Sequence, residues 1–107
     1  MKMFDNNFDK VLGKADMIFQ LHNRKKGETW KEMPIDALAS GIKEEYEEWM
    51  EKWHLTLKGL RDNKKEDAKD AEEDQFFEIL DMINSCLMYA ERLRMRMEKR
   101  KKSESKV

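Results

Sequence analysis

The chain has 107 residues, of which 42% are charged and 39% hydrophobic. This length allows one domain at most, and a content of only 4 glycines and 1 proline argues against a β fold with many tight turns. The formal net charge of −1 argues against binding of nucleic acid through bulk charge. No apolar run is long enough for a membrane span or follows the first residues as a signal peptide would, so we expect a cytoplasmic protein without membrane contact.

An amphipathic helix is predicted from about residue 6 to residue 24. Its apolar residues recur at steps of three and four, which is the period of one helix face. His22 lies near the end of this face, and a lone histidine there is more often a hydrogen-bonded packing residue than a ligand. The predicted face carries Phe8, Val11, Leu12, Ala15, Ile18, Phe19 and His22.

The helix runs into the polar stretch from Asn23 to Trp30, which contains three consecutive cations and a glycine and is typical of a surface loop. Basic residues at a helix C-terminus can satisfy its last carbonyl groups. Alternatively, Lys26 and its neighbours offer cations for phosphates, and Trp30 offers a flat ring for a nucleobase. The composition of this stretch favours neither interpretation.

A second amphipathic helix is predicted to begin near Pro34, because the missing N–H of proline costs nothing in a first turn. Gly41 is expected to mark a close helix crossing. Glu45 lies at the edge of the apolar face and Glu48 flanks it, while Glu44, Glu47 and Glu51 fit a solvated face. The apolar face carries Ile35, Leu38, Ile42, Tyr46, Trp49, Trp53, Leu57 and Leu60.

Residues 61–74 form a charged connection, and the second half of this segment is expected to start the third helix. This segment lacks the glycine of an EF-hand calcium loop, and its acids do not have the ligand spacing of such a loop. The pair Glu51-x-x-His54 matches the ligand pair of di-iron bundles. Those sites need a second such pair, which the chain lacks, so we interpret the match as coincidence.

The third helix is predicted from about residue 69 to residue 99 and is apolar nearly all round between Phe76 and Ala90. Two other helices of one small chain cannot easily cover such a helix. We therefore expect a homodimer or homotetramer with this helix central to the interface. Cys86 is interpreted as a buried packing thiol. The fold class predicted is all-α, a bundle of three main helices over residues 1–102 with a disordered tail at 103–107.

Acidic residues interrupt this apolar helix in a narrow polar stripe that contains Glu78 and Asp81. Burying such a pair is costly unless it is paired or holds a metal. A short connection makes the second and third helices antiparallel neighbours, which brings Glu45 and Glu48 towards the same place. Carboxylates without histidine or cysteine favour a hard ion, Mg²⁺ or Mn²⁺.

These motifs resemble those of the MazG-like, all-α nucleoside triphosphate pyrophosphohydrolase superfamily, whose signature is E-x-x-E on one helix and E-x-x-D on the next. Here they read E-Y-E-E, from Glu45 to Glu48, and E-I-L-D, from Glu78 to Asp81. The stretch HNRKKGETW is similar to the loop before the first acidic helix in small phage and bacterial members. The resemblance covers about residues 8–92, and the four acids are its specific part.

The resemblance implies hydrolysis of a nucleoside or deoxynucleoside triphosphate to the monophosphate and pyrophosphate. The four acids would hold Mg²⁺, which binds the phosphates and helps to generate the attacking water. Asn23 and Asn84 would contact the nucleotide, Lys26 would pair with phosphate, and Trp30 would stack on the base or enclose it. Sites of this family are commonly built across a dimer.

Three alternatives remain. Glu44 and Glu47 also satisfy E-x-x-E, although the helical positions favour Glu45 and Glu48. The chain could instead be a non-catalytic helical oligomer that binds a partner or nucleic acid through the basic run from Arg92 to Lys102. It could also hydrolyse another phosphorylated metabolite, such as phosphoribosyl-ATP, whose enzymes share the acidic bundle.

Overall fold

The computed structural model describes residues 6–104, and these fold into helices alone. The helices are α1 (Asn6–Lys26), the short 3₁₀ helix η1 (Thr29–Lys31), α2 (Ile35–Arg61) and α3 (Lys65–Glu104), and no strand occurs in this range. This arrangement confirms the prediction of an all-α fold with three main helices. Within the same range no helix is both long and apolar enough to span a membrane.

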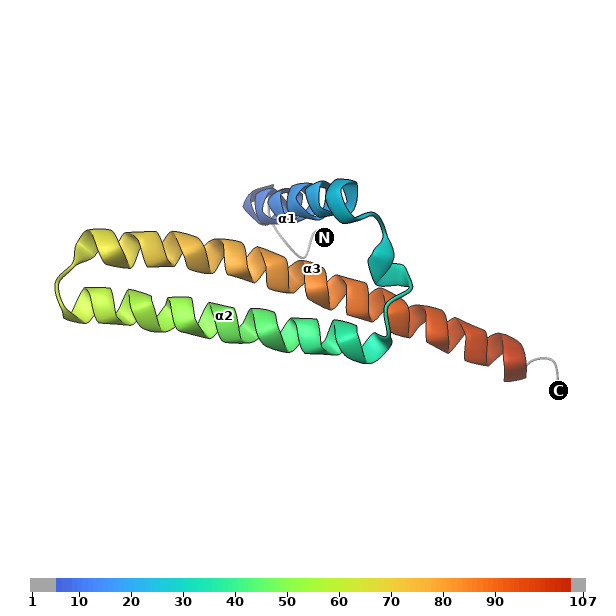
Figure 1. Cartoon of the computed structure of the whole chain (residues 1–107). Helices are drawn as coiled ribbons and strands as arrows, with labels where there is room; N and C mark the ends of the chain where they lie inside the picture. The colour runs from blue at the N-terminus through green and yellow to red at the C-terminus, as the bar shows by residue number, and fades with distance from the viewer. Residues whose placement is uncertain (1–5, 105–107) are drawn as a thin grey trace.

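Helices α2 and α3 form a long antiparallel hairpin (Figure 1). Asn63 makes the turn with a left-handed backbone (φ 58°), a conformation that asparagine tolerates better than most residues. Close to this turn the two helices touch through small residues. A Cβ built on Gly59 would lie only 2.8 Å from the backbone nitrogen of Ala68. The close crossing is therefore at Gly59. The prediction for Gly41 was wrong, because a Cβ there would meet nothing within 4 Å.

Helix α1 packs against α3 and leaves most of α2 uncovered (Figure 1). The contact is fixed by Asn84, which is buried and donates from Nδ2 to the backbone oxygen of Ala15 over 2.9 Å. Gly27 then ends α1 in the left-handed conformation (φ 66°), with its N–H bonded to the Asn23 carbonyl. Arg92 of α3 donates to the carbonyl oxygens of Trp30 and Met33 and thereby ties the connection through η1 to the hairpin.

Several element ends differ from the predicted ones. α1 continues to Lys26, so half of the expected loop is helical, and Pro34 precedes α2 as its N-cap residue. α3 begins at Lys65 and includes Ser103 and Glu104, which the sequence placed in a disordered tail; residues 105–107 lie outside the described range. Cys86 is exposed, which corrects its assignment as a buried packing thiol.

The buried hydrophobic core is small for the length of the chain. The radius of gyration is 17.9 Å, whereas a compact domain of this length has about 13 Å. Many large apolar side chains stay exposed, among them Leu60 at 61% and Leu87 at 60%. The buried hydrophobic residues are Ala15, Leu38, Ala68, Ala71 and Leu80.

Candidate metal and nucleotide site

Three of the four predicted acids meet between α2 and α3. Glu45, Glu78 and Asp81 each contribute a carboxylate oxygen, and these oxygens lie within 4.8 Å of one another. Glu78 is also within hydrogen-bonding reach of Glu48, which is more exposed and completes the cluster on its solvent side. The helical periods of the two motifs produce this arrangement, because each E-x-x-E or E-x-x-D pair occupies one face of its helix.

The acids are held in an electrostatically unfavourable environment. Partial burial, followed by the charges of Glu48, Asp81 and Glu78, raises the pKa of Glu45 to about 7. Burial and then Glu48 raise the pKa of Glu78. Asp81 also has a raised pKa, chiefly through burial, although His22 acts in the opposite direction. Loss of solvation and mutual repulsion therefore both favour the protonated acids while no cation is present.

Two oxygens of this cluster have no hydrogen-bond partner. They are Oε2 of Glu45 and Oε2 of Glu78, both buried from solvent. Among the described side chains, those of residues 8–25 and 27–104, no lysine, arginine or histidine forms an ion pair with any of the four acids. Buried acceptors without donors are costly, and a cation would satisfy them. An all-carboxylate donor set of this kind fits Mg²⁺ or Mn²⁺.

A cavity of about 280 Å³ adjoins the acids and is lined by α1, η1, α2 and α3. Of the predicted nucleotide-binding residues, Asn23, Trp30 and Asn84 line it together with Glu45 and Asp81. The structure thus brings these three close to the acids, although they are far apart in sequence. The side chain of Lys26 lies outside the part of the chain that the structure describes.

Trp30 is less exposed than a residue of a polar surface loop. Its ring packs edge-on against Phe19, with 6.2 Å between ring centroids, and is half-buried. The indole Nε1 is buried without a hydrogen-bond partner in the described structure. Trp30 therefore has a packing contact, and it also carries an unused donor next to the cavity.

The sequence did not identify His22 and Ser85 as site residues, yet both line this cavity. His22 lies near enough to Asp81 to lower the pKa of that carboxyl group. The signal available for His22 was its position, since it lies near the end of the apolar face of α1 and adjoins Asn23. Ser85 belongs to the same polar stripe of α3 as Glu78 and Asp81, four residues after Asp81.

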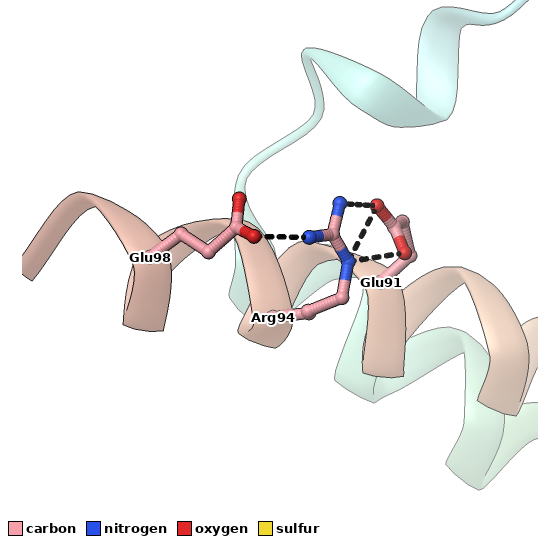
Figure 2. A network of polar contacts seen from close by, with 3 residues as sticks. All are labelled: Glu91, Arg94 and Glu98. Atoms are coloured by element: carbon pink, nitrogen blue, oxygen red, sulfur yellow. Dashed lines mark hydrogen bonds and ion pairs between the residues drawn. The ribbon is translucent and has the colours of Figure 1, made fainter. Parts of the chain in front are cut away.

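The basic end of α3 projects beyond the hairpin and forms contacts of its own. Arg94 is bound by Glu91 on one side and Glu98 on the other, the latter at 2.9 Å (Figure 2). Arg92 is engaged by backbone carbonyls, as described above. Part of the predicted basic run is therefore neutralised within the helix or used to hold the chain together.

No protein-family model matches the chain, and no match was found among curated proteins or solved structures. The MazG-like resemblance accordingly rests on the acidic motifs and on their neighbours in sequence.

Proposed function

We propose that the protein is a Mg²⁺-dependent nucleoside triphosphate pyrophosphohydrolase of the MazG-like type. The observation that carries the proposal is the convergence of Glu45, Glu78 and Asp81, with two buried carboxylate oxygens that lack any partner. A cluster that serves only packing would not gather acids whose charges repel one another. The adjoining cavity, with two amides and an indole at its wall, gives a nucleotide a place beside the acids.

In this proposal the acids hold the metal ion, and the residues of the adjoining cavity bind the nucleotide. Glu45, Glu48, Glu78 and Asp81 would hold the ion, which when bound supplies positive charge to the phosphates and makes a water more acidic. Water then attacks a phosphorus of the triphosphate, the bond to the leaving pyrophosphate breaks, and a carboxylate of the cluster accepts the proton of the water. Asn23, Trp30 and Asn84 orient the nucleoside, with Lys26 as the cation for phosphate.

The proposal includes a homodimer or homotetramer. The exposed apolar side chains of α2 and α3 support it, because soluble monomers rarely expose contiguous apolar patches of large area.

The test is a screen of the common ribonucleoside and deoxynucleoside triphosphates with Mg²⁺, with release of pyrophosphate as the readout. Phosphoribosyl-ATP is included as a separate substrate. We expect release from at least one nucleoside triphosphate and its loss when EDTA is added. Release from phosphoribosyl-ATP alone would assign another substrate. Absence of release from every substrate, with salt-sensitive DNA binding, would favour the non-catalytic alternative.

A further inference from the structure

The apolar face of α2 is largely uncovered in the single chain. Tyr46, Trp53, Leu57 and Leu60 are exposed by 48%, 39%, 47% and 61%. Their steps of three and four place them on one face of the helix. Trp49 fills the space between the first two, since its ring lies 5.9 Å from that of Tyr46 and stacks on Trp53 at 5.8 Å. We call these five residues the aromatic row.

Helix α3 approaches this row only at Trp49, which is half-buried and borders a hollow shared with Phe76 and Leu80, because most of the contact of α3 is with another face of α2. The residues of α2 that face α3 are small or polar, such as Thr56, which accepts a hydrogen bond from Gln75, and Gly59 against Ala68. Helix α1 lies on α3 and leaves the row open as well. Leu38 of the predicted apolar face is buried, but among the described residues most of the aromatic row remains uncovered.

The surface area indicates how large the missing partner is. The chain exposes 8849 Å², whereas a compact monomer of 12.9 kDa exposes about 6,300 Å². The excess is about 2,500 Å² per chain, and obligate dimers bury roughly 1,000–2,500 Å² on each partner. Part of the excess belongs to the projecting end of α3, and part to exposed apolar side chains, among them Tyr46, Trp53, Leu57 and Leu60 of the aromatic row. An excess surface area of this size falls within the range that each chain of an obligate dimer buries.

The order of residues along α2 fits a second copy of the same helix. About the midpoint between Trp49 and Met50, Tyr46 and Trp53 lie at equal distances, and so do Ile42 and Leu57. An antiparallel copy would therefore meet an aromatic residue with an aromatic residue and an aliphatic one with an aliphatic one. Self-complementarity of this kind is the requirement of a twofold interface.

We infer that the aromatic row is a homodimer interface in which α2 packs antiparallel against α2 of a second copy, centred between Trp49 and Met50. This places α2 at the interface, where the sequence had placed α3. The inference does not depend on the proposed hydrolase activity, because it rests on area and spacing, and its tests measure mass and cross-links.

The first experiment is light scattering coupled to size exclusion at about 50 µM protein. We expect twice the 12.9 kDa mass of the chain for the wild type and the single mass for Trp53→Glu/Leu57→Glu. The matched control is Met17→Glu on α1, which is 62% exposed and lies outside the row. Circular dichroism verifies that each variant stays helical. A monomeric wild type, a dimeric double variant or a monomeric Met17→Glu would each overturn the inference.

The second experiment tests the register with cysteines in a Cys86→Ser background. Tyr46→Cys and Trp53→Cys chains are co-expressed, oxidised and run on a non-reducing gel. We expect a disulfide-linked dimer, since the antiparallel register places these two positions opposite each other. Each variant alone should stay unlinked, because its two cysteines would be displaced by about 10 Å along the helix, beyond disulfide reach. Linkage in the single variants alone would show a parallel pair and overturn the register.

Discussion

Two regions of the α2–α3 hairpin are rich in acids, its turn half (residues 52–74) and its middle (residues 45–48 and 78–81), but the acids have different surroundings in the two regions. Near the turn, Asp62, Asp67, Asp70 and Asp74 are exposed, and Asp74 has Lys52 as an ion-pair partner at 3.8 Å. At the middle of the hairpin, Glu45 and Glu78 are half-buried, and each has one oxygen without a hydrogen-bond partner among the described residues. The two helices meet tightly near the turn, whereas at the middle of the hairpin a cavity lined also by α1 and η1 adjoins the acids.

The comparison teaches that the density of acids does not define a site. A solvated carboxylate interacts favourably with water and needs no cation, whereas a desolvated one next to other carboxylates does. At the turn, side-chain hydrogen bonds such as Gln75 to Thr56 satisfy the polar groups between the helices. At the middle of the hairpin, no described residue donates a hydrogen bond to Oε2 of Glu45 or Oε2 of Glu78. The following predictions test this difference between the two groups of acids.

The largest effect is expected on activity. Glu45→Gln and Glu48→Gln should each lower pyrophosphate release at saturating Mg²⁺ by a factor of about 100 or more, because loss of a charge that neutralises the transition state costs several kcal/mol. Glu44→Gln and Glu47→Gln should change it less than about twofold, and so should Asp70→Asn at the turn. Loss of activity in Glu44→Gln and Glu47→Gln alone would shift the motif by one residue. Equal activity in all five variants would remove the site.

The next effect concerns the fit of the helices. Gly59→Ala should lower the free energy of unfolding by about 1–3 kcal/mol, because its Cβ would press on the Ala68 backbone. Gly41→Ala should raise it by up to about 1 kcal/mol, since its Cβ meets nothing and alanine favours helices. Urea denaturation at equal protein concentration measures both. Equal destabilisation by the two substitutions would contradict the tight packing at the turn and the open space at Gly41.

The third prediction concerns pH. The folded chain keeps the proton of Glu45 up to about pH 7, whereas the unfolded chain releases it near the ordinary value of 4.5. The folded state therefore binds more protons between these values, and rising pH favours unfolding. The raised pKa values of Glu78 and Asp81 act in the same direction. Without divalent ions, the contribution of this cluster to the melting temperature should fall from pH 5 to pH 8.

Calorimetry of wild type and Glu45→Gln, each with EDTA or Mg²⁺, isolates that contribution. The difference in melting temperature should grow with pH in favour of Glu45→Gln when EDTA is present. Mg²⁺ at pH 8 should raise the melting temperature of the wild type by a few degrees and that of the variant by less. If Mg²⁺ raises both equally, the ion acts elsewhere on the chain.

The sequence predicted the helices and the meeting of the acids because both depend on local period. Glu78 and Asp81 interrupt an apolar helix, and their partners on α2 follow from one short connection. Prediction from the sequence was wrong where a residue's contacts or burial depend only on the tertiary packing of the helices. Gly41 and Gly59 are both glycines within one helix, and nothing local tells which of them touches α3. Cys86 lies in an apolar run and is nevertheless exposed.

The position of His22 at the site could likewise not be predicted from the sequence. Its place beside Asp81 depends on the direction in which α1 crosses α3, and that direction is set by the Asn84 bond to Ala15 and by the tie from Arg92 to η1. None of these contacts can be predicted from the period of apolar residues in the sequence. Of the α1 residues that line the cavity, Asn23 was expected from the resemblance, whereas Phe19 and His22 were identified only by the structure.

The smallest effect is expected at the ion pair of the turn half of the hairpin. Lys52 and Asp74 are 3.8 Å apart, and the Asp74 side chain is 59% exposed, so water and salt screen their attraction. Asp74→Asn should change the free energy of unfolding by about 0.5 kcal/mol or less and leave pyrophosphate release unchanged. Glu78→Gln is the same chemical change one turn further along α3, at the middle of the hairpin, and it should raise metal-free stability while abolishing activity. Urea denaturation in EDTA, with the activity assay in parallel, compares the two directly. A cost above about 1.5 kcal/mol for Asp74→Asn would mean that the turn half of the hairpin also depends on a carboxylate charge, and the contrast between the two regions would be lost.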